Sequence, residues 1–327
     1  TAAGIEFFGH SDTEVVLKSY IHWGEKCLDR FNGIFAFAVW EEATQRLFFA
    51  RDRMGVKPFF YALKNDTFIF GSEIKTLLEY PDIEPVIDRK GIIDLLFIGP
   101  GRTPGCGVFR DIHELEPGHC GTFDRNGLRT FSYWKLKDRL HTETFEEPSD
   151  HVRYLVTDAI RRQLVSDVPL GTFLSGGLDS SIISAVAASH FRSLGHQLDT
   201  FSVTYTDNQK YFKTSKFQPT TDEPYIQMMA EFLGSNHHTF VVDNEQLALA
   251  LKAAVDARDL PGMADVDSSL LLFCEEIKKH VTVALSGECA DEIFGGYPWY
   301  RDEKIRSAYG FPWAQTTAMR QKFLTPH

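Results

Sequence analysis

The chain has 327 residues, a length that suits two domains of ordinary size. Hydrophobic residues make up 43% and charged residues 24% of the sequence, the proportions of a soluble globular protein. The formal net charge of -11 argues against a nucleic-acid-binding surface. No apolar stretch approaches the roughly 20 residues that cross a bilayer, so we expect no membrane partner.

The five cysteines are widely spaced and form no Cys-x-x-Cys pair, which argues against a disulfide framework or a zinc knuckle. We therefore expect a reducing, cytoplasmic location. The sequence opens at Thr1 without an initiator Met, and it reads as a fragment that starts inside an element.

Residues 1 to about 140 are predicted to be strand-rich. Short runs of Phe, Val and Ile at 31–40, 46–50, 58–62 and 67–70 alternate with Gly, Asn, Asp and Pro, as in antiparallel sheets with tight turns. A helix is expected over 12–21, with Ser11 as N-cap and Glu14 completing a capping box.

A second pattern begins near residue 145, after a polar linker at 136–150. Expected strands at 169–174, 199–205, 238–242 and 281–285 alternate with expected helices at 150–163, 180–189, 222–233, 244–257 and 268–279. The helix at 222–233 has Thr220 and Glu223 at capping-box spacing. This alternation predicts an α/β domain whose parallel sheet is covered on both faces.

The first predicted site is the loop Leu174-Ser175-Gly176-Gly177-Leu178-Asp179-Ser180, between a hydrophobic strand and a helix. Two glycines let the backbone approach a bulky anion, and the helix N-terminus offers unpaired N–H groups, so the loop predicts a phosphate site. Asp179 would repel phosphate unless a cation lay between them, which favours a Mg²⁺ ligand. The alternative is a plain turn in which Ser180 or Asp179 caps the helix.

A second loop, Ser286-Gly287-Glu288-Cys289-Ala290-Asp291-Glu292, also follows a predicted buried strand. In a parallel sheet both loops lie at the carboxyl ends of strands, where such folds bind ligands. Asp179 and Asp291 are then predicted to share one Mg²⁺ on a triphosphate, with Glu288 beside the reacting phosphorus.

The two loops together resemble the synthetase domain of glutamine-hydrolysing asparagine synthetase, a PP-loop ATP pyrophosphatase. Stretches 9–15, 31–38, 50–58 and 72–75 are similar to a class II glutamine amidotransferase domain. The resemblance implies an α+β, αββα-type glutaminase domain over 1–140, incomplete at its N-terminus. An α/β ATP pyrophosphatase domain would follow over 145–327, with its C-terminal part missing.

The resemblance also implies a reaction. Aspartate would attack ATP to give β-aspartyl-AMP, and ammonia from glutamine would displace AMP, with ATP and Mg²⁺ as cofactors. Glu288 would be the catalytic acid, and Asp12 would hold the α-amino group of glutamine. The nucleotide-binding set would be Leu174, Ser175, Gly176, Gly177, Asp179, Ser180, Val203, Ser286 and Gly287, with Asp179 and Asp291 holding the metal.

Two departures from the family pattern matter. The family's glutaminase nucleophile is an N-terminal Cys, which would lie upstream of Thr1 together with the Arg-Gly and Asn-Gly-Glu motifs; otherwise the protein would be an ammonia-dependent or impaired variant. Cys289 stands where the family commonly has Gly, so a positive φ there would be strained.

Asp265, Asp267 and Tyr297 are weaker candidates for the substrate side, and Asp267 equally suits a helix N-cap. His237 and His238 are adjacent at a strand start, so they would point to opposite faces rather than share a metal. An enzyme that adenylates another carboxylate, such as a β-lactam-forming synthetase or a tailoring amidotransferase, and a catalytically silent scaffold are the alternative functions. The oligomeric state is open, with a homodimer as one option.

Overall fold

The computed structural model describes residues 4–98, 101–140, 144, 146–214, 219–308, 318 and 322. They form two compact units that divide between Arg139 and Leu140. Within these described ranges, no helix combines the length and apolar character that a membrane crossing requires.

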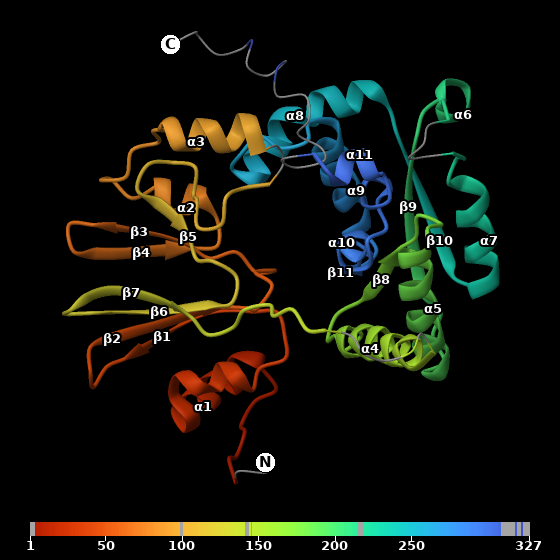
Figure 1. Ribbon diagram of the computed structural model, residues 1–327. Helices are drawn as coiled ribbons and strands as arrows, with labels where there is room; N and C mark the ends of the chain where they lie inside the picture. The colour runs from red at the N-terminus through yellow and green to blue at the C-terminus, as the bar shows by residue number, and fades with distance from the viewer. Residues whose placement is uncertain are drawn as a thin grey trace. The chain divides into compact units, whose positions relative to one another are not determined.

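The first unit contains two antiparallel sheets (Figure 1). One has the order β1-β2-β6-β7 and comprises β1 (Ala36–Glu41), β2 (Arg46–Arg51), β6 (His119–Asp124) and β7 (Gly127–Ser132). The other has the order β4-β3-β5 and comprises β3 (Phe60–Lys64), β4 (Thr67–Gly71) and β5 (Ile112–Glu114). The first strand begins at Ala36, five residues later than expected, and β5 to β7 were not predicted.

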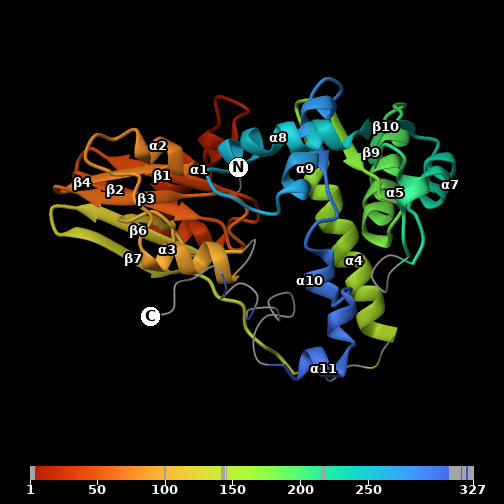
Figure 2. The ribbon, with the colours of Figure 1, turned by 90° about the horizontal axis from the view of Figure 1, so that it is seen from above.

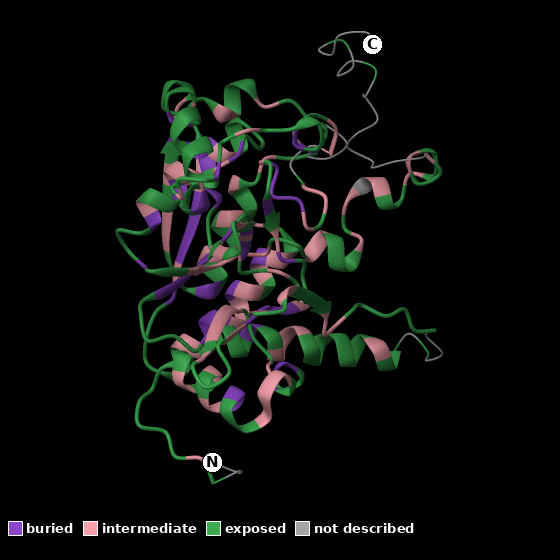
Figure 3. Cartoon of the chain, turned by 90° about the vertical axis from the view of Figure 1, so that its left-hand side faces the viewer, coloured by how far each residue is buried: buried purple, intermediate pink, exposed green. Residues whose placement is uncertain are grey.

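Aromatic rings fill the space between the two sheets. Phe49 of β2 stacks on Phe59 and Phe68, with ring centroids 5.2 and 5.0 Å apart. Burial and stacking of these rings contribute to the hydrophobic stabilisation between the layers. The buried residues, purple in Figure 3, include Phe48, Phe49 and Ala50 of β2.

Helices cover the outer faces of this pair of sheets. Tyr20 of α1 (Asp12–Trp23) and Leu28 of η1 (Gly24–Asp29) pack against Phe48 on the first sheet. On the side of the second sheet lie α2 (Ile74–Leu78), α3 (Arg89–Ile93) and the π-helical turn η2 (Asp94–Ile98) (Figure 1). The layering confirms the predicted αββα-type, antiparallel fold class.

The second unit is built on a parallel sheet with the order β10-β9-β8-β11. Its strands are β8 (Leu170–Phe173), β9 (Asp199–Tyr205), β10 (Asn236–Val242) and β11 (Val283–Leu285). This confirms the predicted α/β class. The chain moves from β8 outward to β10 and then returns to the other side of β8, so the strand order reverses between β8 and β11. Such a switch point opens a crevice at the carboxyl ends of the two strands.

Helices cover both faces of this sheet (Figure 2). On one face, α4 (Glu146–Gln163), α5 (Leu178–Ser193) and α7 (Glu223–Leu233) contribute Ile160, Ala187 and Leu233 to one core. On the other, α9 (Asp265–Ile277) packs Phe273 and Ile277 on Phe201, and α8 (Asn244–Arg258) lies against α9. The remaining helices are short: α6 (Asn208–Tyr211), α10 (Ala290–Phe294), η3 (Pro298–Tyr300) and α11 (Glu303–Arg306).

Two predicted capping boxes do not form. Ser11 does cap α1, but Glu14 reaches past it and accepts from the N–H groups of Phe8 and Gly9, at 2.9 and 2.7 Å. Glu223 instead accepts from Thr204 and Asn208, at 3.1 and 2.9 Å, and so ties the start of α7 to β9 and α6. In both cases a partner outside the helix offers the carboxylate a better donor than the cap backbone. The linker predicted at 136–150 is also too long, because α4 begins at Glu146.

Candidate active site

The first loop connects β8 to α5 and is braced from inside by Ser180. Its buried Oγ accepts from the N–H of Ser175 and donates to the carbonyl of Gly177, each at 3.2 Å. The N-cap of α5 is Gly177, and no side chain among the described residues caps this helix. The alternative reading of the loop, a turn in which Ser180 or Asp179 caps the helix, therefore does not hold. The first N–H groups of α5 are thereby left for an anion.

A glycine is required at position 176 by packing against α7, not by contact with a ligand in the cavity. Its φ is +79°, and an added Cβ would lie 2.7 Å from Cβ of Tyr225 and 2.9 Å from the N of Ile226. The loop therefore touches the first turns of α7, where any larger residue would displace it. Gly176 does not line the cavity described below, unlike its neighbours Ser175 and Gly177.

The second loop packs directly on the first. A Cβ added to Gly287 would lie 3.0 Å from Cβ of Asp179 and 3.2 Å from the N of Ser180. The parallel pairing of β11 with β8, Leu285 opposite Thr172, brings the two loops together at one edge of the sheet. The predicted adjacency of the loops is thus observed.

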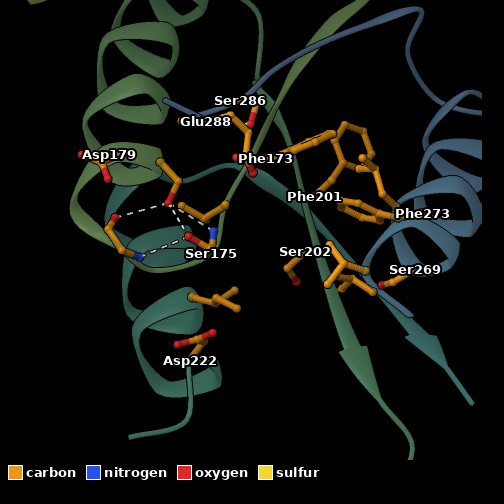
Figure 4. Close-up of a pocket in the computed structure, with 18 of the residues that line it drawn as sticks. Phe173, Ser175, Asp179, Phe201, Ser202, Asp222, Ser269, Phe273, Ser286 and Glu288 are labelled. Carbon is orange, nitrogen blue, oxygen red and sulfur yellow. Dashed lines mark hydrogen bonds between the residues drawn. The ribbon is translucent and has the colours of Figure 1, made fainter. Parts of the chain in front are cut away.

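The two loops form one wall of a cavity of about 490 Å³. In Figure 4, Ser286 and Glu288 lie at its top, Asp179 at the left and Asp222 at the bottom, with Phe173, Phe201 and Phe273 at the right. The predicted residues that line it are Leu174, Ser175, Gly177, Asp179, Ser180, Val203, Ser286, Gly287, Glu288, Asp291 and Tyr297.

The Asp291 carboxylate of this cavity acts on the neighbouring Asp179. Burial raises the pKa of Asp179 above its ordinary value, and the negative charge of Asp291 raises it further. A cation bound between the two carboxylates would relieve this repulsion. The described residues contain no group of three or more candidate metal ligands, but Mg²⁺ commonly takes one or two carboxylates and completes its shell with phosphate and water. The pair therefore fits Mg²⁺ on a bound polyphosphate.

The turn after α10 holds Asp291 in place. The N–H of Gly296 donates to the carbonyl of Asp291 at 3.0 Å, and an added Cβ on Gly296 would meet the Asp291 carboxylate at 1.8 Å. Tyr297 donates to Glu292 at 3.2 Å and stacks on Trp299 with centroids 4.2 Å apart. Burial and the Glu292 carboxylate raise the pKa of Tyr297 to about 12, so its hydroxyl is protonated at neutral pH.

Glu288 and Cys289 follow Ser286 in the second loop. The N–H of Glu288 donates to Oγ of Ser286 at 3.2 Å, and the Glu288 side chain is exposed to the cavity. Cys289 has φ +71° and ψ 0°, so the left-handed conformation expected to strain a non-glycine residue is present.

Asp265 and Asp267 do not line the cavity. α9 starts at Asp265, three residues before the expected start, so Asp267 lies inside the first turn and is not the N-cap, which is Ala264. Asp267 accepts from the N–H of Met263 at 2.7 Å and pairs with Arg258, while Asp265 is exposed. Val266, Ser269 and Leu270, spaced along one helix face, line the cavity instead.

Several lining residues escaped the sequence analysis, among them Ser202, Tyr205 and Asp222, and the aromatic group Phe173, Phe201 and Phe273. The sequence signal for the aromatic group is weak, because apolar residues on β8, β9 and α9 equally suit a purely structural core. Phe173 and Phe273 lie with ring centroids 5.0 Å apart and make one side of the cavity apolar.

His237 and His238 point to opposite faces of the sheet, as predicted. His237 contacts Thr200 and Ser202, whereas His238 contacts Asp199 at 2.9 Å and stacks on Phe201.

A separate cavity of about 470 Å³ lies in the first unit, and Asp12 lines it together with Lys57 and Ser72. Oδ1 of Asp12 accepts from the N–H of Thr13 at 2.7 Å. Asp52, almost fully buried, accepts from the N–H groups of Val56 and Lys57, both at 3.0 Å, and so fixes the loop that carries Lys57.

Sequence comparisons relate this chain to known proteins. The family model for asparagine synthase matches residues 151–327, and a glutamine amidotransferase domain model matches residues 1–134. Asparagine synthetase [glutamine-hydrolyzing] 3 of Bacillus subtilis is 53% identical over 325 residues, which cover 99% of this chain and 53% of the relative. Asparagine synthetase [glutamine-hydrolyzing] 1 of the same organism is 36% identical over 304 residues, covering 92% of this chain and 45% of the relative.

The amidase chyE of Penicillium rubens is 31% identical over 317 residues, covering 93% of this chain and 46% of the relative. The chain thus spans about half the length of the curated relatives it matches. Because the asparagine synthase model covers more than half of the residues, including both site loops, the chain belongs to the asparagine synthase family.

Proposed function

We propose that the protein synthesises asparagine from aspartate, with ATP as the activating substrate and glutamine as the nitrogen source. The observation that carries this proposal is the direct packing of the Gly287 loop on Asp179 and Ser180, which unites two Ser-Gly loops and two acids at one switch point. Family membership supports aspartate as the acceptor.

Each wall of the cavity suits one part of ATP. The unpaired N–H groups at the start of α5 suit the phosphates, together with Ser175, Gly177 and Ser286. The apolar side near Leu174 and Val203 suits the base. Asp179 and Asp291 would hold Mg²⁺, which when bound neutralises phosphate charge and makes pyrophosphate a better leaving group.

The proposed reaction has two steps, adenylation of aspartate and displacement of AMP by ammonia. A β-carboxylate oxygen of aspartate bonds to the α-phosphorus of ATP while the bond from that phosphorus to pyrophosphate breaks. Ammonia next attacks the acyl carbon, AMP leaves with the bonding electron pair, and the nitrogen gives up a proton. Glu288 is the residue we assign to formation of the acyl-adenylate, because it is exposed, lines the cavity and follows Ser286 in the second loop, to which its backbone N–H donates.

The first unit would supply the ammonia. Asp12 lines its cavity, and a carboxylate there suits the α-ammonium of glutamine. We assign residues 1–140 to a glutaminase domain and 145–327 to the ATP pyrophosphatase domain, in keeping with the boundary between Arg139 and Leu140. A cytoplasmic location belongs to the same proposal.

The test is ATP–pyrophosphate exchange on the full-length protein, with aspartate compared against glutamate, β-alanine and larger carboxylic acids. We expect aspartate to give the fastest exchange. Exchange that is stimulated by another acid and not by aspartate would overturn the acceptor while leaving adenylation in place.

The second candidate function is amidation of a carboxylic acid other than aspartate. The same assay tests it, and the reason to do so is that one relative is named an amidase rather than an asparagine synthetase. The residues around ATP suit any adenylating member of the family, so the choice of acceptor depends on the region of Glu288 and Tyr297. A preference for a bulky carboxylate in the exchange assay would favour this second function.

A further inference from the structure

A chain of hydroxyl and imidazole groups runs between β9 and β10 and ends at the candidate ATP cavity. The parallel register places His237 opposite Thr200 and Thr239 opposite Ser202, on one face of the sheet. Oγ1 of Thr200 lies 2.9 Å from both Oγ of Ser235 and Nδ1 of His237. Nε2 of His237 lies 3.0 Å from Oγ of Ser202, which is 3.3 Å from Oγ1 of Thr239.

Both ring nitrogens of His237 are therefore occupied, which fixes the plane of the ring. Burial lowers the pKa of His237, and the neighbouring His238 lowers it further, so the ring is neutral at physiological pH. A neutral imidazole donates from one nitrogen and accepts at the other. His237 thus presents a defined donor or acceptor to Ser202.

Ser202 is the member of this chain that reaches the cavity. It is 5% exposed, lines the cavity wall and precedes Val203, another lining residue. A hydroxyl has one donor and two acceptor sites, and His237 and Thr239 take two of the three. One hydrogen-bonding site of Ser202 remains, and the cavity that Ser202 lines offers space for a partner.

We propose that His237 is a positioning residue for nucleotide recognition, which orients the Ser202 hydroxyl so that its remaining hydrogen-bonding site meets the nucleotide. This inference rests on the proposed function, because the cavity must take ATP. Without the ring, Ser202 would rotate among its staggered rotamers and lose a directed contact with the ligand. His237 itself does not line the cavity and would act only through Ser202.

Substitution of His237 by Gln or by Asn tests the contacts of its two ring nitrogens separately. In His237→Gln the amide reaches about as far as Nε2 and keeps a polar partner for Ser202. In His237→Asn the amide stays near the position of Nδ1 and serves Thr200 alone. His238→Asn is the matched control, because His238 lies next in the sequence, on the opposite face, and contacts Asp199.

The experiment measures ATP binding to the full-length protein by competition with a fluorescent ATP analogue, and the kcat and KM for ATP in pyrophosphate exchange. We expect His237→Asn and Ser202→Ala each to raise Kd and KM for ATP about three- to tenfold with kcat little changed, the loss of one hydrogen bond. His237→Gln should recover most of the affinity, and His238→Asn should match the wild type. The double variant Ser202→Ala/His237→Asn should bind no more weakly than Ser202→Ala alone.

Three results would overturn the inference. One is equal ATP affinity in His237→Asn and His238→Asn, and another is an equal loss in His237→Asn and His237→Gln. The third is a further loss from His237→Asn when Ser202 is already Ala, since His237 would then act by another route. Thermal unfolding of each variant separates these outcomes from misfolding, and Ser202→Ala tests the contact if the His237 variants do not fold. A wild type that fails to bind ATP would instead refute the proposed function.

Discussion

Cys289 holds a left-handed backbone conformation in the loop that carries Glu288 and Asp291. Its side chain is exposed and lines the cavity, so it gains little from packing. A residue with a Cβ costs about 1–2 kcal/mol in this conformation, whereas glycine adopts it freely. The strain is therefore located at the site itself.

We predict that Cys289→Gly stabilises the protein by about 1 kcal/mol. The free energy of unfolding from urea denaturation provides the measurement, with Cys274→Ala, an exposed helical cysteine, as the control. A lower stability of Cys289→Gly would show that contacts of the thiol outweigh the backbone strain.

Burial and the negative charge of Asp291 both disfavour the ionised form of Asp179 and so raise its pKa. Because its pKa is raised in the fold, ionisation of Asp179 costs stability above that pKa, and the cost disappears below the ordinary carboxyl pKa of about 4. A residue that is kept at the expense of stability indicates a functional role.

We predict that Asp179→Asn reduces ATP–pyrophosphate exchange at least about a hundredfold while glutaminase activity is retained. The same variant should be more stable than the wild type at pH 7, by up to about 1 kcal/mol, and the gain should vanish near pH 3. Equal loss of both activities would contradict the assignment of Asp179 to the adenylating site.

At the scale of elements, the site depends on two strand–loop–helix units that meet side by side. β8 leads into α5 and β11 leads into α10, and Gly287 is the point where the loops touch. A Cβ at Gly287 would press on Asp179 at 3.0 Å, closer than nearly all real Cβ contacts. The separation of the loops is thus set by the absence of one side chain.

We predict that Gly287→Ala lowers pyrophosphate exchange about tenfold or more, because shifts well below 1 Å misplace phosphate-binding groups. Gly101→Ala is the matched control, since its added Cβ would meet only a side-chain carbon of Ile98 at 3.9 Å. Wild-type exchange in Gly287→Ala would show that the loops separate without cost to binding.

At the scale of the whole molecule, each unit contains its own cavity. The acids also divide between them, with Asp12 in the first unit and Asp179, Glu288 and Asp291 in the second. The proposed reaction would use the first cavity for glutamine and the second for ATP. If so, the two proposed activities should respond separately to mutation.

We predict that Asp12→Asn raises the KM for glutamine about ten- to a hundredfold, the loss of a charged hydrogen bond to an ammonium. Synthesis from added ammonia should stay at the wild-type rate, because Asp12 does not line the cavity of the second unit, which we propose binds ATP. The comparison of glutamine- and ammonia-dependent synthesis on the full-length protein tests this. A fall in both rates would contradict separate sites.

Local sequence determined much of this protein. Alternating apolar runs and glycine loops predicted β8 to β11, the main helices around them and the two loops, because backbone preference and side-chain periodicity act over a few residues. The strand predicted at 199–205 is β9 (Asp199–Tyr205). Residue type and spacing alone predicted that the acids of the two loops, Asp179, Glu288 and Asp291, belong to one site.

Tertiary structure decided the rest. β6 escaped prediction because Gly121 weakens its strand pattern, yet that glycine is required where the Phe49 ring would lie 2.5 Å from a Cβ. Glu14 and Glu223 do not form the expected capping boxes. They accept hydrogen bonds instead from groups outside their helices that folding brings close, Gly9 and Thr204. The strand order that places β11 beside β8 joined two loops more than 100 residues apart, and no local pattern specifies such an order. The sequence thus determined the two loops and their acids, whereas packing determined that the loops meet and which other side chains complete the cavity.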